Sequence, residues 1–434
     1  MIREGYKMAS VKDLGNNKYR VIISNGFDEK GKQKRFTKII KANSLAAAKK
    51  LANTLEVDYK RNPPAVQTKE ELTSITFAEL VERWRRLKKP TLAPKTYENY
   101  EVILNNSLLP HFGGMKIKDI TPLTVEEYLN LLRTQPNKFR GNKTKPLSTK
   151  TVYSYFAVLR RLLEIAVSWD LLEHNPCGKV DKPKPTEPAI ASFYDDNDIK
   201  KLLKCLEIEE DSVNDKIKKM FEKKKDKDTE QKAAIKHLNF SMFKTYIILA
   251  LSSGFRRSEM LGLEYSDFNL HNSTVTISRT NHYSPDLGLY TREVLKNGTA
   301  ARTVPMPNSA MELVKSLYKE QLKCRKMMGS AWEKSDRVFI STKGSTVSQA
   351  GGPVNPDNIS QAFERFLKKY NLPVMTLHGL RHSCVSFLLN RGFDISTVAD
   401  RVGHKDVRVT QAIYNHIYDS NKLKCANAFD ELFK

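Results

Sequence analysis

The sequence is poor in cysteine and has no long apolar run. Its five cysteines are odd in number and scattered, and no C-x-x-C pair occurs. This pattern argues against a disulfide framework, a zinc site built on paired cysteines and a dithiol redox motif. No stretch of 18 apolar residues occurs, and the N-terminus has no apolar run typical of a signal peptide. We therefore expect reduced thiols, no membrane role and a cytoplasmic location.

Acidic residues are also in short supply. The 434 residues include 73 Lys and Arg against 49 Asp and Glu, which gives a formal net charge of +24. Such an imbalance indicates a polyanionic partner, and nucleic acid is favoured over an acidic membrane surface. The length predicts two to four domains, because domains usually have about 100 to 200 residues.

Residues 1–65 are predicted to form a small sheet packed on one helix. Segments 18–24 and 35–40 alternate as strands do, and the turn residues 28–31 separate them. Ser44 then caps a helix that starts at Leu45. The hairpin carries basic residues, including Arg20, Lys32, Lys34, Arg35 and Lys38. A ribbon of two or three strands fits the major groove of DNA, so we prefer a DNA-binding module over a merely solvated basic face.

A linker at 66–73, just after the adjacent prolines at 63 and 64, leads into a helical domain at 74–176. Thr76 is expected to cap a helix, and Ser148 another. Apolar residues recur at helical spacing after each cap, namely Leu80, Val81, Trp84 and Leu87, then Val152, Phe156, Leu159, Leu163 and Ala166. Trp84 and Trp169 are interpreted as packing residues. Basic residues occupy the other positions of these helices, and we expect Arg85, Arg86, Lys150 and Arg160 among them to contact DNA.

A second linker, at 177–189, is rich in proline and charge. The third domain, 190–434, is predicted to be mixed: helices at 195–206 and 243–251, strands at 274–278, 290–295 and 302–305, and helices thereafter. The charged stretch 207–236 is expected to be an exposed helical excursion or a disordered loop, and no function is assigned to it. The fold class is therefore multidomain α+β, with a small β-sheet-plus-helix domain, an all-α domain, and a mainly helical domain with a small antiparallel sheet.

The third domain contains a spaced set of cationic and imidazole side chains that ends in a tyrosine. Its members are Arg256, Lys296, His378, Arg381, His404 and Tyr414. Arg256 follows a turn at Gly254, and Glu259 lies one helical turn further on, where it can hold the arginine. Lys296-Asn297-Gly298 is typical of the tip of a β-hairpin. Arginines, a lysine and histidines suit a negatively charged phosphorus centre, and a tyrosine hydroxyl can attack it, so the set points to phosphoryl transfer on a nucleic-acid backbone.

Two alternatives within this set have to be weighed. Tyr418 follows Tyr414 by four residues but lacks the Thr-x-x-x-Tyr-x-His context that starts at Thr410. His378 and His382 have the i, i+4 spacing of some zinc sites, but no third ligand lies in register, so His382 is interpreted as structural. No metal site is therefore expected, and no other cofactor is expected either.

Taken in order, these motifs resemble the tyrosine recombinase family, the site-specific DNA integrases of phages and conjugative transposons. The resemblance extends over nearly the whole chain. It implies that 1–65 is an arm-site-binding domain, that 74–176 is the core-binding domain and that 190–434 is the catalytic domain. Ser252-Ser253-Gly254 stands where the family more often has Thr-Gly, and Arg302-Thr303-Val304-Pro305 matches the segment after the family's hairpin lysine.

The resemblance also implies roles for the residues. Tyr414 is the expected nucleophile that forms a 3′-phosphotyrosyl link, Lys296 the general acid, and Arg256, His378, Arg381 and His404 the groups that bind and activate the phosphate. Expected partners are double-stranded DNA with core and arm attachment sites, further copies of the chain in a tetramer on DNA, a host DNA-bending protein and an excision factor. An apolar stripe at Leu423, Ala426, Phe429, Leu432 and Phe433 is expected to pack on its own domain or on a neighbouring protomer.

Two rival functions share these features. A type IB topoisomerase-like enzyme would use the same residues to nick and reseal one strand. A non-catalytic DNA-binding regulator could have the same fold, but it has no need of a nucleophilic tyrosine. The arm-type module and the C-terminal stripe favour a multimeric recombinase that works through a Holliday junction.

Overall fold

The structure is a computed structural model that divides into two compact units, Met1–Pro185 and Thr186–Lys434. It describes residues 10–15, 18–27, 33–61, 75–134, 146–183, 193–293, 301–345, 348–404 and 406–415. For 24–27, 33–36, 58–61 and 412–415 only the backbone is described. The division falls inside the stretch 177–189 that the sequence predicts as a linker.

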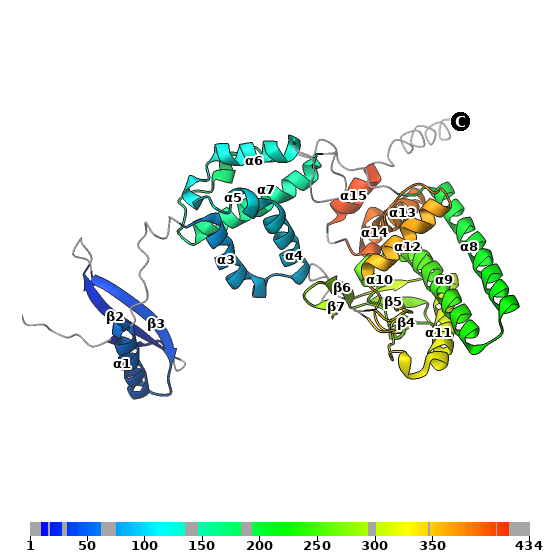
Figure 1. Ribbon diagram of the computed structural model, residues 1–434, viewed down its shortest axis with the longest axis horizontal. Helices are drawn as coiled ribbons and strands as arrows, with labels where there is room; N and C mark the ends of the chain where they lie inside the picture. Colours follow the sequence, from blue (N-terminus) through cyan, green and yellow to red (C-terminus); the bar gives the residue numbers. More distant parts are fainter. Residues whose placement is uncertain are drawn as a thin grey trace, which may run out of the picture. The chain divides into compact units, whose positions relative to one another are not determined.

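The N-terminal part is a three-stranded antiparallel sheet with one helix along a face (Figure 1). Its elements are β1 (Ser10–Asp13), β2 (Lys18–Phe27), β3 (Gln33–Lys41) and α1 (Leu45–Arg61). Tyr19, Val21 and Ile23 alternate along β2 and are buried against Ala48 and Ala52 of α1. The hairpin and the helix that follows Ser44 are as predicted, whereas β1 was missed because four residues carry too little periodic signal.

Residues 75–183 form a helical bundle around an apolar core. Its main helices are α3 (Phe77–Lys88), α4 (Pro94–Ile103), α5 (Leu109–Phe112), α6 (Pro122–Thr134) and α7 (Thr149–Ser168). Thr76 and Glu79 form the capping box of α3, in which each side chain bonds the other's backbone N–H. Ser148 accepts a hydrogen bond from the backbone N–H of Thr151 and caps α7 as predicted.

The predicted core faces of these helices are confirmed, with one exception. On α7, Val152, Phe156, Leu159, Leu163 and Ala166 are all buried. On α3, Leu80, Val81 and Trp84 are buried, but Leu87 is 54% exposed. The prediction for Leu87 was wrong because Leu87 lies in the last turn of α3, which ends at Lys88 and is followed by a short 3-10 helix at Lys89–Thr91. Trp84 stacks between Tyr97 and Tyr100, which confirms it as a packing residue.

The core of this bundle continues past residue 176. Cys177 and Val180 are buried in it, so the first residues of the predicted second linker belong to the helical domain. Asn175 closes the corner by accepting the N–H of Cys177.

The second unit is mainly helical with two small antiparallel sheets (Figure 1). Its helices are α8 (Asp196–Lys223), α9 (Lys227–Ser253), α10 (Arg257–Met260), α11 (Asn308–Met328), α12 (Pro356–Lys369), α13 (Leu377–Asn390), α14 (Ile395–Val402) and α15 (Val407–Asn415). Its strands are β4 (Phe268–Asn269), β5 (Thr274–Ile277), β6 (Thr280–Ser284), β7 (Gly288–Arg292) and β8 (Arg302–Pro305). Helices α8, α11 and α13 pack on α9.

The charged stretch 207–236 is helical rather than a loop. It forms the end of α8 and the start of α9, two helices of 28 and 27 residues that lie side by side (Figure 1). Asp226 caps α9 by accepting the N–H of Thr229. The helical alternative of the sequence prediction is therefore confirmed, and the two predicted short helices are parts of long ones.

The two strands that flank Lys296 do not pair with each other in the described residues. β7 pairs with β6, and β8 pairs with β5. The additional strand β6, which the sequence analysis missed, is the partner of β7, and the predicted hairpin tip at 296–298 lies outside the described residues. Lys296 itself lies outside the described residues.

Candidate active site

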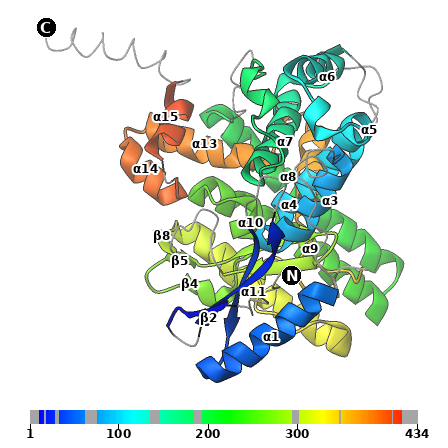
Figure 2. The same cartoon turned by 90° about the vertical axis from the view of Figure 1, so that its left-hand side faces the viewer.

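Three of the predicted site residues lie on neighbouring segments of the second unit. His378 and Arg381 are on α13, and His404 follows Gly403, the residue that caps the end of α14. Helices α13, α14 and α15 pack on one another at one end of the unit (Figures 1 and 2). Tyr414 falls within α15, and only its backbone belongs to the described part of the structure.

Arg256 lies close to the end of α14, and a left-handed turn before it directs the chain there. Helix α9 ends at Gly254, whose φ is +65°. A Cβ on Gly254 would lie 2.7 Å from Cγ1 of Val402 and 3.3 Å from Sγ of Cys384, so no other residue fits this turn without displacement. Two residues later, Arg256 is the N-cap residue of α10.

Glu259 holds Arg256 by both its backbone and its side chain. Nη1 of Arg256 donates to Oε1 of Glu259 at 2.8 Å, and its backbone N–H donates to Oε2 at 3.0 Å. Nη2 of Arg256 donates to the carbonyl oxygen of Gly403 at 2.9 Å. The last contact links Arg256 to the residue before His404, 147 positions away.

Arg302 shares the same carboxylate, and the sequence analysis gave it no role beyond marking the family's spacing. Nη2 of Arg302 donates to Oε2 of Glu259 at 2.8 Å. Glu259 is only 2% exposed. Burial by itself would raise the pKa of Glu259, but the hydrogen bond and charge of Arg302, together with Arg256, bring it below its usual value. Glu259 is therefore an ionised carboxylate between two guanidinium groups.

Arg381 is almost completely buried, at 1% exposure, and no carboxylate of the described residues forms an ion pair with it, although the charge of Glu259 acts on it. Nη1 donates to the carbonyl oxygen of Gly254 at 2.7 Å. Nε and Nη2 have no hydrogen-bond partner within the part of the chain that the structure describes. Burial, and after it the charge of Arg256, lowers the pKa of Arg381 to about 9. A buried cation with unused donors is the local condition that an anionic ligand would relieve.

The histidines of this cluster are held in their neutral form. Burial, followed by the charges of Arg381 and Arg256, lowers the pKa of His378, and the same causes lower the pKa of His404 to about 3. Nδ1 of His404 is 2.8 Å from Oγ1 of Thr410, a buried residue of α15. The sequence analysis had used Thr410 only as part of a motif.

His382 packs edge-on against His378, with ring centroids 4.6 Å apart. Burial, and then the neighbouring His378, lowers the pKa of His382 to about 4. In the described residues, no group of three or more His, Cys, Asp or Glu side chains is arranged to hold a metal ion. Cys384, on the same helix, is buried, and burial raises the pKa of its thiol to about 11.

The basic residues proposed on the N-terminal sheet do not all share one face. Arg20 is paired across the ladder with Ile39, and Lys38 is paired with Val21. Because directly opposed residues point to the same side of a sheet, exposed Arg20 lies on the open face and Lys38 on the side of α1. Lys34 and Arg35 lie in β3 with only their backbone described, and Lys32 lies outside the described residues.

The basic residues of the helical domain differ from one another in their contacts. Nε and Nη2 of Arg85 donate to the two oxygens of Glu101 at 2.9 and 2.7 Å, and Nη1 donates to Glu82. Arg86 and Lys150 are exposed, and Arg160 is half-buried. The exposed pair therefore has the surroundings that a phosphate contact needs, whereas Arg85 is already occupied within the bundle.

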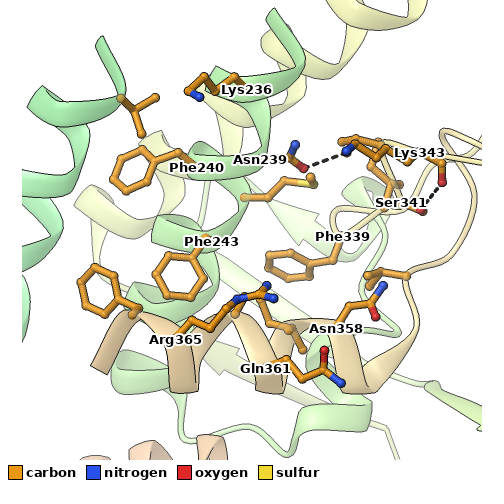
Figure 3. A pocket seen from close by; sticks show the side chains of 18 of the residues that line it. Lys236, Asn239, Phe240, Phe243, Phe339, Ser341, Lys343, Asn358, Gln361 and Arg365 are labelled. Atoms are coloured by element: carbon orange, nitrogen blue, oxygen red, sulfur yellow. Dashed lines mark hydrogen bonds between the residues drawn. The ribbon is translucent and has the colours of Figure 1, made fainter. Parts of the chain in front are cut away.

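A cavity of about 660 Å³ in the second unit lies apart from the cationic cluster. Phe240, Phe243 and Phe339 border it, together with the basic side chains of Lys236 and Arg365 (Figure 3). Of the site residues whose side chains are described, Arg256, His378, Arg381 and His404, none lines it. The cluster around Arg381 lies instead at the ends of α9 and α14, where Arg381 bonds Gly254 and Arg256 bonds Gly403.

No helix in the described residues is both long enough and apolar enough to span a membrane.

Comparison with known proteins gives a consistent result. The model of the Phage integrase family matches residues 197–421, and that of the Phage integrase N-terminal SAM-like domain matches residues 76–133. A protein named Tyrosine recombinase XerC-like, from Caldanaerobacter subterraneus subsp. tengcongensis, is 23% identical, with 96% of this chain and 97% of the relative aligned. The ICEBs1 integrase of Bacillus subtilis is also 23% identical, over 98% of this chain and 100% of the relative.

Solved structures show the same fold. The Tn1549 transposon integrase, solved in complex with a circular intermediate DNA, superposes with a TM-score of 0.59 at 18% identity, covering 82% of this chain and 99% of that chain. A lambda integrase tetramer bound to a Holliday junction gives a TM-score of 0.51 at 14% identity, over 93% of this chain and 95% of that chain. These superpositions establish a shared fold. Because the sequence identities are low, the roles of the site residues have to be argued from the residues of this chain.

Proposed function

The chain belongs to the phage integrase family, a family of tyrosine recombinases, and we propose that its active site is the cluster around Arg381, with Tyr414 as nucleophile. The protein is a site-specific recombinase of a mobile element. The observation that carries the assignment of the site is the convergence of three cationic or imidazole side chains: Arg256 binds the buried carboxylate Glu259, Arg381 bonds the turn before Arg256, and the charges of both arginines act on His404.

Charge is the main reason for assigning phosphate binding to this cluster. Two arginines contact Glu259, and a third, Arg381, is buried beside them with donors unused among the described residues. The excess of positive charge would stabilise the extra negative charge of a pentacoordinate phosphorus centre, and guanidinium groups can donate in pairs to its non-bridging oxygens.

The proposed reaction begins with attack by Tyr414. Its phenolic oxygen forms a bond to the scissile phosphorus, and the bond from phosphorus to the 5′-oxygen breaks, which leaves a 3′-phosphotyrosyl link and a 5′-hydroxyl. A phenol with a pKa of about 10 is only about one part in a thousand ionised at neutral pH, a cost of roughly 4 kcal/mol. The cations of the site lower this cost, and neutral His378 can accept the phenolic proton.

His404 is proposed as a hydrogen-bond donor to the phosphate. If the hydroxyl of Thr410 donates to Nδ1, the single proton of the neutral ring must reside on Nε2, which then faces outward as a donor. Lys296 is proposed to protonate the departing 5′-oxygen.

The energy of the broken bond is retained in the phosphotyrosine. The 5′-hydroxyl of another strand can attack that bond, so exchange is close to isoenergetic and consumes no ATP. We propose that two rounds of exchange pass through a Holliday junction in a tetramer of this chain. The sheet and helix at the N-terminus would bind arm sites, the helical domain and the catalytic unit would bind the core site, and a host DNA-bending protein and an excision factor would set direction.

The experiment that tests the proposal is covalent trapping. Nicked suicide duplexes from the element's ends are incubated with the wild-type chain, Tyr414→Phe and the matched control Tyr418→Phe, without metal or ATP. We expect a labelled protein–DNA adduct with the wild type and with Tyr418→Phe only. An adduct that persists in Tyr414→Phe would refute the nucleophile. Resealing of one strand without exchange between two duplexes would identify a topoisomerase-like enzyme instead.

A further inference from the structure

The charged stretch 207–236, to which the sequence analysis assigned no function, forms part of the wall of the large cavity in the second unit. Glu209 and Val213 of α8 and Lys236 of α9 border the cavity from this stretch. The rest of the wall comes mainly from α9 up to Phe243, from residues 339–343 and from α12. The cavity therefore lies between the two long helices and α12, and its walls belong to one unit of the chain.

The interior of this cavity is apolar and aromatic. Phe240, Phe339 and Phe366 are 7%, 3% and 6% exposed, and Phe243 is half-buried. The ring centres of Phe243 and Phe366 are 5.2 Å apart. The volume of about 660 Å³ falls within the range of roughly 300–1,000 Å³ that is usual for ligand sites. An apolar group that enters the cavity would leave water for a surface of aromatic carbon, which is favourable.

Positive charge surrounds this apolar interior. The charged residues that border the cavity are four cations and one carboxylate, namely Lys236, Lys343, Arg365, Lys369 and Glu209. Glu209 is already bound, because Lys369 and the hydroxyl of Tyr370 both donate to its Oε2. Within the part of the chain that the structure describes, Lys236, Lys343 and Arg365 form no ion pair with a carboxylate. Figure 3 shows Lys236 and Lys343 at the edge of the space that the phenylalanine rings border.

This combination fits an acidic, amphipathic segment of a protein. Apolar side chains on one face of such a segment match the phenylalanines, and carboxylates beside them match the unpaired cations. Lys343, Asn358 and Arg365 are exposed, so the cavity is open along this side. An open groove suits a peptide better than a small molecule, because pockets for small molecules usually enclose most of the ligand surface.

Two other occupants match the groove less well. Segment 416–434 of a second copy of the chain carries three acidic and three lysine side chains, so it brings no net negative charge to the cations. Single-stranded DNA brings negative charge, but its bases need exposed ring faces on which to stack. Phe240, Phe339 and Phe366 are each more than nine-tenths buried and do not offer such faces.

We propose that this groove is a docking site for an acidic, amphipathic segment of a partner protein. Charge complementarity and the aromatic interior together select this occupant. None of the described residues of the active-site cluster borders the groove, so the partner and the scissile phosphate do not compete for the same side chains. The inference does not depend on the identity of the nucleophile.

Binding of a labelled peptide to the full chain tests the proposal. The probe is a fluorescein-labelled peptide of about 16 residues, with phenylalanine or leucine at i, i+3, i+4 and i+7 and glutamate at most other positions. Two altered probes separate the contributions: one has alanine at the apolar positions, and the other has lysine in place of glutamate. By fluorescence anisotropy we expect a Kd on the order of 10 µM for the probe, and at least about tenfold weaker binding of either altered peptide.

Arg365→Glu is the principal variant, because Arg365 is exposed and the substitution leaves the apolar interior unchanged. It should weaken binding of the probe at least about tenfold, since an attraction becomes a repulsion. Lys319→Glu is the matched control. Lys319 is exposed on α11 and does not border the groove, and the substitution changes the net charge equally, so binding should stay within about twofold of the wild type.

Phe243→Ala tests the aromatic interior and should also weaken binding at least about tenfold. Should this variant not fold, the probe with alanine at its apolar positions tests the same contact from the side of the ligand. In the covalent trapping assay, Arg365→Glu should form as much adduct as the wild type. Failure of the proposed function and failure of this docking site are therefore distinguishable.

Four results would overturn the proposal. The groove is not the docking site if the probe does not bind saturably, or if Arg365→Glu and Lys319→Glu weaken its binding equally. Equal binding of the alanine probe would show attraction by net charge alone. If a peptide of residues 416–434 binds more tightly than the probe and Arg365→Glu weakens it, a second copy of the chain covers the groove. If a single-stranded oligonucleotide behaves in this way, the groove binds nucleic acid instead.

Discussion

Arg381 donates from Nη1 to the backbone carbonyl oxygen of Gly254 at 2.7 Å, although 127 positions separate the two residues. The turn that this bond holds is the one that leads into Arg256. Arg256 and Arg381 are therefore positioned by one backbone feature, a left-handed turn that only glycine fits. Any change in that turn would move both arginines together.

Glu259→Gln should destabilise the protein as well as slow cleavage. The substitution leaves the charges of Arg256 and Arg302 beside a buried neutral amide. Removing one partner of a buried ion pair typically costs about 3–5 kcal/mol, which urea denaturation would detect. The control is Glu312→Gln, since Glu312 is exposed and its pair with Lys315 should contribute about 1 kcal/mol at most. Equal effects of the two substitutions would contradict our account of the cluster.

Thr410→Val should slow cleavage about tenfold with little loss of DNA binding. Valine has nearly the shape of threonine but cannot bond Nδ1 of His404, so the proton of the ring is no longer directed to Nε2. Single-turnover cleavage and DNA affinity are measured on the same preparation. Thr397→Val, on the exposed side of α14, is the control and should cleave at the wild-type rate. An unchanged cleavage rate in Thr410→Val would contradict the proposal that Thr410 directs the proton of the His404 ring to Nε2.

Stability should fall as the pH drops from about 6.5 toward 4. The pKa of His404 is lowered to about 3 and that of His382 to about 4, whereas an unfolded histidine has a pKa of about 6.5. Below pH 6.5 the histidines of the unfolded chain therefore bind more protons than those of the folded chain, and the equilibrium shifts toward unfolding. Each histidine lowers the unfolding free energy by at most about 1.4 kcal/mol per pH unit. Solvent screening makes the effect smaller, because both rings are partly exposed.

Urea denaturation between pH 7.5 and 5.0 measures this dependence. His404→Gln should make the change in unfolding free energy with pH smaller, while His271→Gln, at an exposed turn, should leave it as in the wild type. An unaltered slope in His404→Gln would show that the ring is not held neutral in the folded protein.

Arg85 and Arg86, adjacent in sequence, should respond oppositely to substitution. Arg85→Gln removes the paired bonds to Glu101 and should lower stability by roughly 1.5–3 kcal/mol. Arg86→Gln changes an exposed side chain and should cost no more than about 0.5 kcal/mol, but it should weaken DNA binding and reduce the slope of log K against log salt concentration by about 1. The control is Arg85→Gln, whose slope of log K against log salt concentration, measured at the same temperature, should equal that of the wild type. Equal slopes for Arg86→Gln and the wild type would exclude a phosphate contact.

Elements with a cap and a long apolar periodicity were predictable from the sequence. The helices that begin after Thr76 and Ser148 are examples, because their caps are local and their apolar faces repeat many times. The four-residue strand β1 and the partner strand β6 were missed, since short strands repeat too few times to be recognised and their pairing is not local. Leu87 was misplaced because the end of a helix decides which late positions face the core.

The sequence by itself determined the positive charge, the chemical types of the site residues and their order along the chain. It also determined the local devices that orient them, such as the glycine before Arg256. Only the tertiary structure decided that Glu259 would bind Arg302 as well as Arg256 and that Thr410 would contact His404. It also decided that Arg85 would bind Glu101 within the helical bundle. These contacts join residues that are distant in sequence or on separate elements, so their partners depend on how helices pack, and no local pattern records that.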